Sequence, residues 1–390
     1  MKRNPWVIVF GLFFVVYLTG CGKKGVEAPR VETVDGITYV HNPATPLHPG
    51  QTVVFEEELT FREKDETGEI RLFKPGSFCV DANENVYIAD DSDMAIKIYD
   101  RQGQYLRSIG RQGNGPGEFE SIGNMLFLPD GRLLVADYQQ RRTSLFSPDG
   151  EFLSSFPWKK FYSLVLLADE TSCTVTENVY ADQERELWVK KIDLSGEELQ
   201  AIGKFTPAQF KTVRQGEVMF GMSIPWTPAS IFAGDRKRQW LYHCLNDKYI
   251  IEVYDGQGKL FRKMERPYEP VPVTAEDIQA VKSRYAERPG SVYAKLAEQM
   301  EFSKVKTVTD RLVVDSDGNL WVRLNEEKKE GEKTFTAYDI FSPDGFYEAR
   351  VWLDILPVLF ASGKMYRMAE DEETGLRLLK RYRIIWKEVP

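Results

Sequence analysis

Short runs of β-branched and aromatic residues alternate with clusters of Asp, Asn and Gly along most of the chain. Five of these runs end in the same kind of segment, at 99–103 (YDRQG), 146–150 (FSPDG), 192–196 (IDLSG), 254–258 (YDGQG) and 341–345 (FSPDG). β-Branched and aromatic residues favour strands, and Gly permits the positive φ that closes a tight turn. Each segment is therefore predicted to be a strand end followed by a hairpin turn.

A second pattern precedes three of these segments, at 80–90, 128–137 and 314–322. In each copy an Asp-Gly or Asn-rich turn separates two apolar runs, which is a hairpin signal. One unit thus contains four strands joined by turns. In the first unit we predict strands at Ser77–Val80, Val86–Ala89, Ala95–Tyr99 and Tyr105–Gly110.

The spacing of the turns indicates the architecture. The five segments start at residues 99, 146, 192, 254 and 341, so consecutive starts lie 47, 46, 62 and 87 residues apart. A repeat of roughly 40–50 residues built from four short strands is typical of a β-propeller blade. We predict an all-β fold, a six-bladed β-propeller of four-stranded antiparallel blades over residues 51–390. The expected units cover about 76–119, 120–160, 161–205, 226–266, 306–353 and 354–390.

The sixth unit differs from the other five. Its expected hairpin lies at Leu359–Arg367, but it lacks the Asp-x-x-Gly turn. The segment Thr52–Arg62 alternates like a strand and precedes the first unit. We expect it to complete the sixth blade, because closing the ring with both ends of the chain removes a free sheet edge.

Two insertions interrupt the repeat, at about 206–225 and 269–305. The second is predicted to be a helical hairpin between blades four and five. Thr274 and Asp277 resemble a capping box, Pro289-Gly290 ends the first helix, and Ser291 caps the second. Such a hairpin could be a functional lid on the mouth or rim of the propeller, a plug over an apolar channel end, or a dimer contact.

The strand pattern resembles a known family of repeats. Asn85–Asp90 followed by Ile96–Asp100 is similar to an NHL-type repeat. The loop Ile109–Phe119 resembles the glycine-proline turn of the bacterial six-bladed β-propeller lipoprotein family. The resemblance covers about residues 37–390 and implies a rigid propeller in the cell envelope.

The N-terminus has the pattern of an export signal. Lys2 and Arg3 precede an apolar run of thirteen residues, Trp6–Leu18, which is short for a membrane span. The run ends in Leu18-Thr19-Gly20-Cys21, which resembles the bacterial lipobox. We therefore expect a signal peptide over 1–20, a lipidated Cys21 and a tether over 21–50 that contains a small hairpin around Asp35-Gly36. An ordinary signal peptide or an uncleaved anchor helix is the alternative.

The charge of the chain narrows the class of partner. The net charge is −8, and loss of Lys2 and Arg3 with the signal makes it −10. Nucleic-acid binding requires a basic surface, so we expect no nucleic-acid partner. The basic pairs and triplets at 141–142, 159–160 and 236–238 are interpreted as solvated turns or rim residues.

Four cysteines are present, and lipid is expected to take Cys21. Cys79, Cys173 and Cys244 fall in predicted strands of different blades, where we interpret them as small buried apolar residues. One disulfide among the three is the alternative, since the compartment would permit it.

Metal and catalytic motifs are sparse. Propeller enzymes similar to amidating or streptogramin lyases depend on several histidines, whereas this chain has only His41, His48 and His243. Gluconolactonase-like propellers bind Ca²⁺ through oxygen ligands, for which the candidates here are Asp81, Asn124, Asp169 and Asp315. Asp81 and Asp315 are explained equally by Asx turns, which we favour. The glycine-rich segment 110–117 is no phosphate loop, because no Gly-Lys-Ser/Thr follows it.

These observations favour a membrane-anchored binding or scaffolding lipoprotein of the bacterial cell envelope, whose ligand is a protein, peptide or glycan. We expect no catalytic residues, no cofactor and no metal site. The alternatives are a Ca²⁺-dependent hydrolase or lyase of the gluconolactonase-like class and a purely structural envelope protein.

Overall fold

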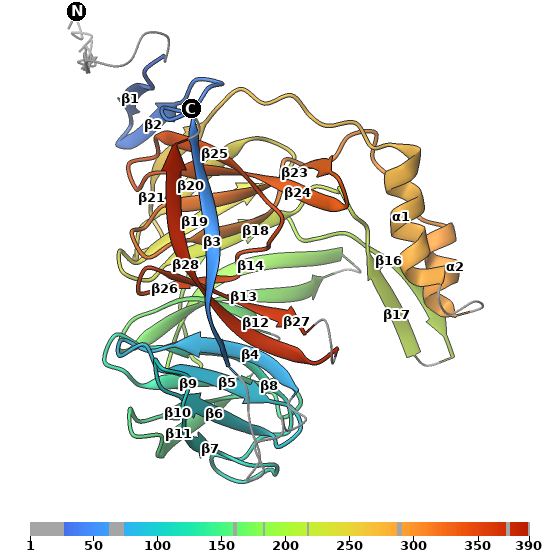
Figure 1. Cartoon of the computed structure of the whole chain (residues 1–390). Coiled ribbons are helices and arrows are strands. Elements are labelled where there is room, and N and C mark those ends of the chain that lie inside the picture. Colours follow the sequence, from blue (N-terminus) through green and yellow to red (C-terminus); the bar gives the residue numbers. More distant parts are fainter. Residues whose placement is uncertain are drawn as a thin grey trace, which may run out of the picture.

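The chain forms a ring of six small antiparallel sheets, shown in a computed structural model (Figure 1). The structure describes residues 27–61, 74–158, 162–181, 184–216, 218–286, 291–371 and 375–388. The predicted signal peptide, Cys21, Lys159 and Lys160 lie outside these residues. The six-bladed propeller predicted from the repeat is confirmed.

The first three blades follow one another along the chain. Blade 1 contains β4 (Pro75–Val80), β5 (Val86–Asp90), β6 (Ala95–Tyr99) and β7 (Tyr105–Ile109). Blade 2 contains β8 (Ile122–Phe127), β9 (Leu133–Asp137), β10 (Arg142–Phe146) and β11 (Phe152–Pro157). Blade 3 contains β12 (Tyr162–Ala168), β13 (Ser172–Ala181), β14 (Glu184–Asp193) and β15 (Glu198–Phe205).

The other three blades include the two ends of the ring. Blade 4 contains β18 (Ser230–Asp235), β19 (Trp240–Leu245), β20 (Ile250–Tyr254) and β21 (Leu260–Glu265). Blade 5 contains β22 (Thr309–Val314), β23 (Leu320–Glu330), β24 (Lys333–Phe341) and β25 (Tyr347–Leu353). Blade 6 contains β26 (Leu359–Ala361), β27 (Lys364–Glu370), β28 (Arg377–Glu388) and β3 (Gln51–Phe61).

Blade 6 closes the ring with strands from both ends of the chain. β3 pairs antiparallel with β28, from Gln51 opposite Glu388 to Phe61 opposite Leu379, and the two strands lie side by side in Figure 1. This confirms the closure predicted from Thr52–Arg62. It also explains why the sixth unit lacks an Asp-x-x-Gly turn: its third and fourth strands are not consecutive in the chain.

The five repeated segments form the same turn between the third and fourth strands of blades 1 to 5. In each turn the closing glycine has a φ between 75° and 89° and donates its N–H to the carbonyl three residues earlier, as Gly103 does to Asp100 at 2.9 Å. The Asp100 carboxylate also accepts the N–H groups of Gln102 and Gln104. The turn is thus closed by its own side chain, which accounts for the recurring Asp or Ser.

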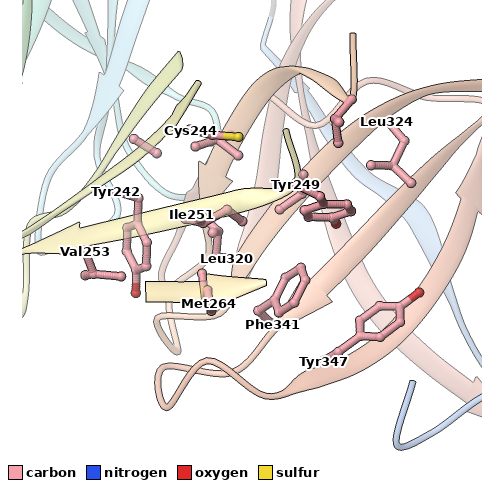
Figure 2. Packing of buried hydrophobic residues seen from close by; sticks show 14 of the residues in the cluster. Tyr242, Cys244, Tyr249, Ile251, Val253, Met264, Leu320, Leu324, Phe341 and Tyr347 are labelled. Atoms are coloured by element: carbon pink, nitrogen blue, oxygen red, sulfur yellow. The ribbon is translucent and has the colours of Figure 1, made fainter. Parts of the chain in front are cut away.

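Strand position within a blade decides burial. Every residue of β5, β6 and β9 is buried, because these middle strands face a neighbouring blade on each side. The outer strand β7 is exposed except for Ile109. Between blades 4 and 5 the buried side chains include Tyr242, Ile251, Leu320 and Phe341, which pack into one cluster (Figure 2). Apolar packing between blades therefore supplies most of the core.

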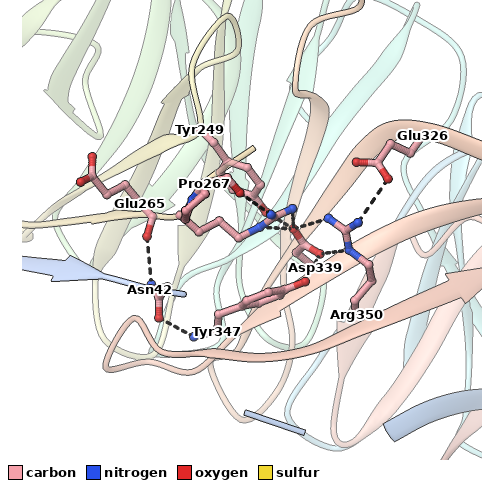
Figure 3. Close-up of polar contacts among 9 residues, drawn as sticks. Asn42, Tyr249, Glu265, Pro267, Glu326, Asp339, Tyr347 and Arg350 are labelled. Carbon is pink, nitrogen blue, oxygen red and sulfur yellow. Dashed lines mark hydrogen bonds and ion pairs between the residues drawn. The ribbon is translucent and has the colours of Figure 1, made fainter. Parts of the chain in front are cut away.

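A cluster of buried charges lies in the same seam between blades 4 and 5 (Figure 3). Asp339 on β24 is fully buried and forms ion pairs with Arg266 at 2.6 Å and Arg350 at 2.8 Å. The hydroxyl groups of Tyr249 and Tyr347 donate hydrogen bonds to the same carboxylate, at 2.5 and 2.8 Å. Burial would raise the pKa of Asp339, but the charges of Arg266 and Arg350 outweigh it, and the pKa is lowered. We call these five residues the Asp339 cluster.

The segment before β3 is attached to the propeller. β1 (Arg30–Val34) and β2 (Ile37–His41) form the hairpin expected around Asp35-Gly36, and β2 continues the sheet of blade 4 by pairing parallel with β21. Asn42 then donates to the carbonyl of Gly345 at 2.9 Å and accepts the N–H of Tyr347 at 2.8 Å. This part of the expected tether is therefore part of the folded body.

Candidate functional site

The central axis of the propeller is surrounded by the first strand of each blade. β4, β8, β12, β18 and β22 contact one another in order, and β22 contacts β26. Inside this ring lies a cavity of about 490 Å³, which we call the central cavity. A cavity of this size suits a small organic ligand. The central cavity is therefore the first place to look for a binding site.

Three arginines from blades 4, 5 and 6 line the central cavity. Arg236 lies in the turn after β18, Arg311 lies on β22, and Arg377 begins β28. Among the described residues, no hydrogen bond or ion pair to any of these three guanidinium groups is present. The cavity thus combines positive charge with a wall that is apolar for the most part, including Phe78, Met125, Leu126, Val358, Leu359 and Met368.

The basic segment 236–238 lies in a largely exposed turn, as predicted from the sequence. Lys237 is exposed, and Arg238 pairs with Asp235 at 2.9 Å and donates to the carbonyl of Asp317 in blade 5. Arg236 is exposed as well, and its side chain also lines the central cavity, where desolvation by the surrounding protein lowers the pKa of its guanidinium. The sequence interpretation therefore holds for the exposure of this turn, but it did not reveal that Arg236 also lines the central cavity.

The candidate Ca²⁺ ligands do not converge. Asp81 accepts the N–H groups of Asn83 and Asn85 at 2.8 and 2.7 Å, and Asp315 closes the equivalent turn in blade 5. Asp169 accepts from Ser172 and pairs with Lys191 at 3.0 Å, while Asn124 alone lines the central cavity. The Asx-turn interpretation is confirmed for Asp81 and Asp315. Within the described ranges, no group of three or more His, Cys, Asp or Glu is placed to hold a metal ion.

The basic pair at 141–142 and the glycine-rich loop at 110–117 are in contact with each other. Arg142 donates to the carbonyls of Gly115 and Glu118 at 2.6 and 2.8 Å, which fixes the loop against blade 2. A Cβ on Gly110 would lie 2.3 Å from the ring of Phe119, so only glycine permits this crossing. The loop is therefore a structural connection between blades 1 and 2.

The cysteines and His243 are structural. Cys79, Cys173 and Cys244 are free and buried on β4, β13 and β19, and burial raises the pKa of the latter two to about 12. These thiols therefore remain protonated and behave as small apolar residues, as predicted. His243 is buried against Phe205 and Phe232 and hydrogen-bonds Glu252 at 3.1 Å and Ser230 at 3.0 Å.

The other two histidines lie near the N-terminal end of the described chain. His41, on β2, contacts Glu265 of β21 at 2.7 Å and Glu32 at 3.1 Å. His48 lies 3.5 Å from Glu348. All three histidines thus face carboxylates, and the structure brings no two of them together on one described site.

The two insertions come together in space. The first forms the hairpin of β16 (Phe210–Gln215) and β17 (Val218–Ser223), and the second forms α1 (Ala275–Ala286) and α2 (Val292–Glu298). Met222 of β17 is buried with Val281, Leu296 and Met300 in one small cluster. We call β16, β17, α1 and α2 the appended unit, which stands beside the propeller in Figure 1. The helical hairpin was predicted, but its packing against β16 and β17 was not. Neither insertion contains a sequence pattern that indicates contact with the other.

Local contacts hold the appended unit together. The predicted capping box is present: Thr274 and Asp277 exchange hydrogen bonds, with the Thr274 N–H 2.9 Å and the Asp277 N–H 3.1 Å from the other's side-chain oxygen. Asp277 also pairs with Lys306 at 2.7 Å. Phe302 from the second insertion packs on Trp226 from the first. No described residue of the appended unit lines the central cavity, so the two are separate candidate sites.

The position of the appended unit follows from the strand directions. The four strands of a blade alternate in direction, so connections between blades emerge at the same face as the loops between second and third strands. Both insertions are such connections, and Glu276 of α1 pairs at 3.0 Å with Lys329 near the β23–β24 tip of blade 5. The described helices are too short to cross a bilayer, so none is a candidate membrane span.

Comparisons with known proteins agree with the architecture. The profile of DUF5128, described as a six-bladed beta-propeller, matches residues 66–155, which include blades 1 and 2. A Bacteroides fragilis protein described as exported superimposes with a TM-score of 0.53 at 10% identity, covering 90% of this chain and 100% of its own. A DUF4221 member from Bacteroides vulgatus gives a TM-score of 0.48 at 12% identity, covering 86% of this chain and 99% of its own.

At these identities the likeness to solved structures is one of fold. A search of curated proteins finds no match to the chain. The profile match over residues 66–155 and the shared fold together support a relation to bacterial six-bladed propeller proteins.

Proposed function

We propose that the protein is an exported, lipid-anchored, NHL-like propeller that binds a protein, peptide or glycan through the appended unit. The observation that carries this proposal is the packing of two separate insertions into one unit with its own buried cluster. The ring of blades does not need such insertions to close, and blades 1 and 2 are connected without one. Additions to a rigid scaffold are common sites of recognition.

The surface of the appended unit supports a role in binding. Phe210, Val213, Val218 and Tyr293 are exposed by 39 to 56% although all four are large apolar residues. They lie on β16, β17 and α2, and α2 contacts both of these strands. Exposed apolar groups gathered on one small unit are typical of a partner surface.

The proposed location rests on the N-terminus and on a structural relative. The apolar run Trp6–Leu18 and the sequence Leu18-Thr19-Gly20-Cys21 match an export signal with a lipid attachment site. The Bacteroides fragilis relative of the same fold is described as exported. A lipid on Cys21 would hold the propeller at the membrane, since each buried CH₂ contributes about 0.8 kcal/mol.

The test compares cross-linked partners of the full chain in cells with and without the appended unit. Residues 210–223 can be removed cleanly, because the N–H of Ile224 already bonds the carbonyl of Gln209 at 3.0 Å. Residues 273–304 can be replaced by Asn-Gly, because Pro272 and Val305 are paired antiparallel. We expect this variant to fold and to lose its cross-linked partners.

A point variant makes the test independent of the excision. Val218→Glu places a charge on the appended unit, and Leu106→Glu places one on the outer strand of blade 1, where exposure is similar at 51% against 56%. We expect Val218→Glu alone to reduce cross-linking. Equal cross-linking by wild type, the excised variant and Val218→Glu would show that the appended unit does not bind the partner. If no cross-linked partner is found at all, a purely structural protein is favoured.

A further inference from the structure

The described wall of the central cavity contains three arginines and no acidic residue. The described lining residues include Arg236, Arg311 and Arg377 but no Asp or Glu. Asp91 is the nearest acidic group to Gly76 in the wall, and its pKa is raised by burial and by Asp90 and lowered by Arg377. Asp91 thus lies beside the wall, and of the three arginines its pKa responds to Arg377.

Basic residues of low exposure elsewhere in the chain are paired. Lys97 bonds Asp90 at 2.6 Å, Lys190 bonds Glu177 at 2.8 Å, and Arg266 bonds Asp339 at 2.6 Å. Arg381 likewise bonds Glu58 at 2.9 Å. The four buried basic side chains are thus neutralised by carboxylates, whereas the more exposed arginines of the cavity wall have no described partner.

A cation that lines a hollow without a partner is unfavourable, because protein replaces part of its hydration. The lowered pKa of Arg236 reflects this cost. Several like charges around one hollow also create a positive potential that concentrates anions there. A guanidinium group is the side chain best suited to bind carboxylate or phosphate oxygens in pairs.

We propose that the central cavity binds a small organic anion, with a carboxylate or phosphate group held by Arg236, Arg311 and Arg377. Its apolar body packs against the apolar wall that includes Phe78, Met125 and Leu359. The volume of about 490 Å³ admits a ligand of this kind. This site is independent of the partner surface proposed for the appended unit, since the two share no described lining residue.

Three matched probes test the chemistry by isothermal titration of the full chain in a non-ionic detergent at low salt. 1-Naphthoate and 1-naphthyl phosphate carry the two candidate anionic groups, and 1-naphthamide is the neutral control. We expect the better anion to bind about 10-fold more tightly than the amide, and its identity distinguishes a carboxylate from a phosphate ligand. The proposal is overturned if neither anion binds more tightly than the amide.

Two variants with the same change of charge test the place. Arg236→Gln removes a cation from the cavity, whereas Lys237→Gln removes one from the exposed side of the same turn. We expect Arg236→Gln to weaken anion binding about 10-fold and Lys237→Gln to change it less than about 2-fold. Arg311→Gln provides a second cavity variant if Arg236→Gln does not fold. Equal affinity of the cavity variants and Lys237→Gln would contradict the proposal even if an anion binds.

Discussion

The seam between blades 4 and 5 and the central cavity both contain arginines, but they accommodate the charge in opposite ways. In the seam, Arg266 and Arg350 share the carboxylate of Asp339, and two tyrosines complete its hydrogen bonds. In the cavity, Arg236 has no such partner among the described residues. In the seam, a carboxylate of the protein neutralises the arginines. In the cavity, the described wall provides no carboxylate, so an anionic ligand could take that position. The comparison separates residues that hold the propeller together from residues that are available to a ligand.

The largest effect is expected from breaking the Asp339 cluster. Asp339→Asn leaves the buried guanidinium of Arg266 without its counter-charge, and removal of one partner of a buried pair costs about 3–5 kcal/mol. Urea unfolding followed by tryptophan fluorescence measures this loss of the free energy of unfolding. Asp344→Asn, on the exposed turn of the same blade, is the matched control and should change stability by less than about 0.5 kcal/mol. A loss below about 1 kcal/mol for Asp339→Asn would show that the cluster contributes little to stability.

A smaller effect is expected from acid. The folded pKa of Asp339 lies below its ordinary value, because Arg266 and Arg350 outweigh the effect of burial. The unfolded chain then binds the proton more tightly than the folded protein does. The stabilisation is complete above the unfolded pKa of about 3.9 and is lost as pH falls through the folded pKa.

The midpoints of urea unfolding at about pH 5, 4 and 3 measure this loss of stability. These pH values bracket the unfolded pKa of about 3.9. We expect the wild-type midpoint to fall more steeply with acid than that of Asp339→Asn, which cannot titrate at this position. Parallel slopes would show that other carboxylates dominate the acid response.

The smallest effect on stability is expected in the cavity. Arg236→Gln removes a charge that has no described partner, so the free energy of unfolding should change by less than about 0.5 kcal/mol or rise slightly. Arg266→Gln, the same substitution in the seam, should cost about 3–5 kcal/mol. Thermal melting of both variants measures the contrast. Equal destabilisation would mean that Arg236 supports the fold as Arg266 does.

The sequence predicted the architecture well because each repeat depends on residues that lie close together in the chain. Each closing glycine and its Asp or Ser lie within five residues of each other, so their turn is visible without knowledge of the rest of the chain. The closing strand at Thr52–Arg62 could be predicted from its alternation and from the unfavourable edge that it covers. The capping box at Thr274 and Asp277 is equally local.

The candidate sites could not be predicted in the same way. Arg236, Arg311 and Arg377 are 75 and 66 residues apart in order and meet only because blades 4, 5 and 6 share one axis. A turn containing Arg236, Lys237 and Arg238 gives no local sign of which side chain reaches the cavity. The contact of Trp226 with Phe302 likewise joins two insertions separated by a whole blade.

The pairing of β3 with β28 has a consequence for how the protein must be made. β3 is among the first segments synthesised, yet its partner is the last strand of the chain, more than 300 residues later. Until β28 arrives, the eleven residues of β3 present an open strand edge to other chains. A nascent chain therefore passes through a long period in which β3 is an unpaired strand edge that can aggregate.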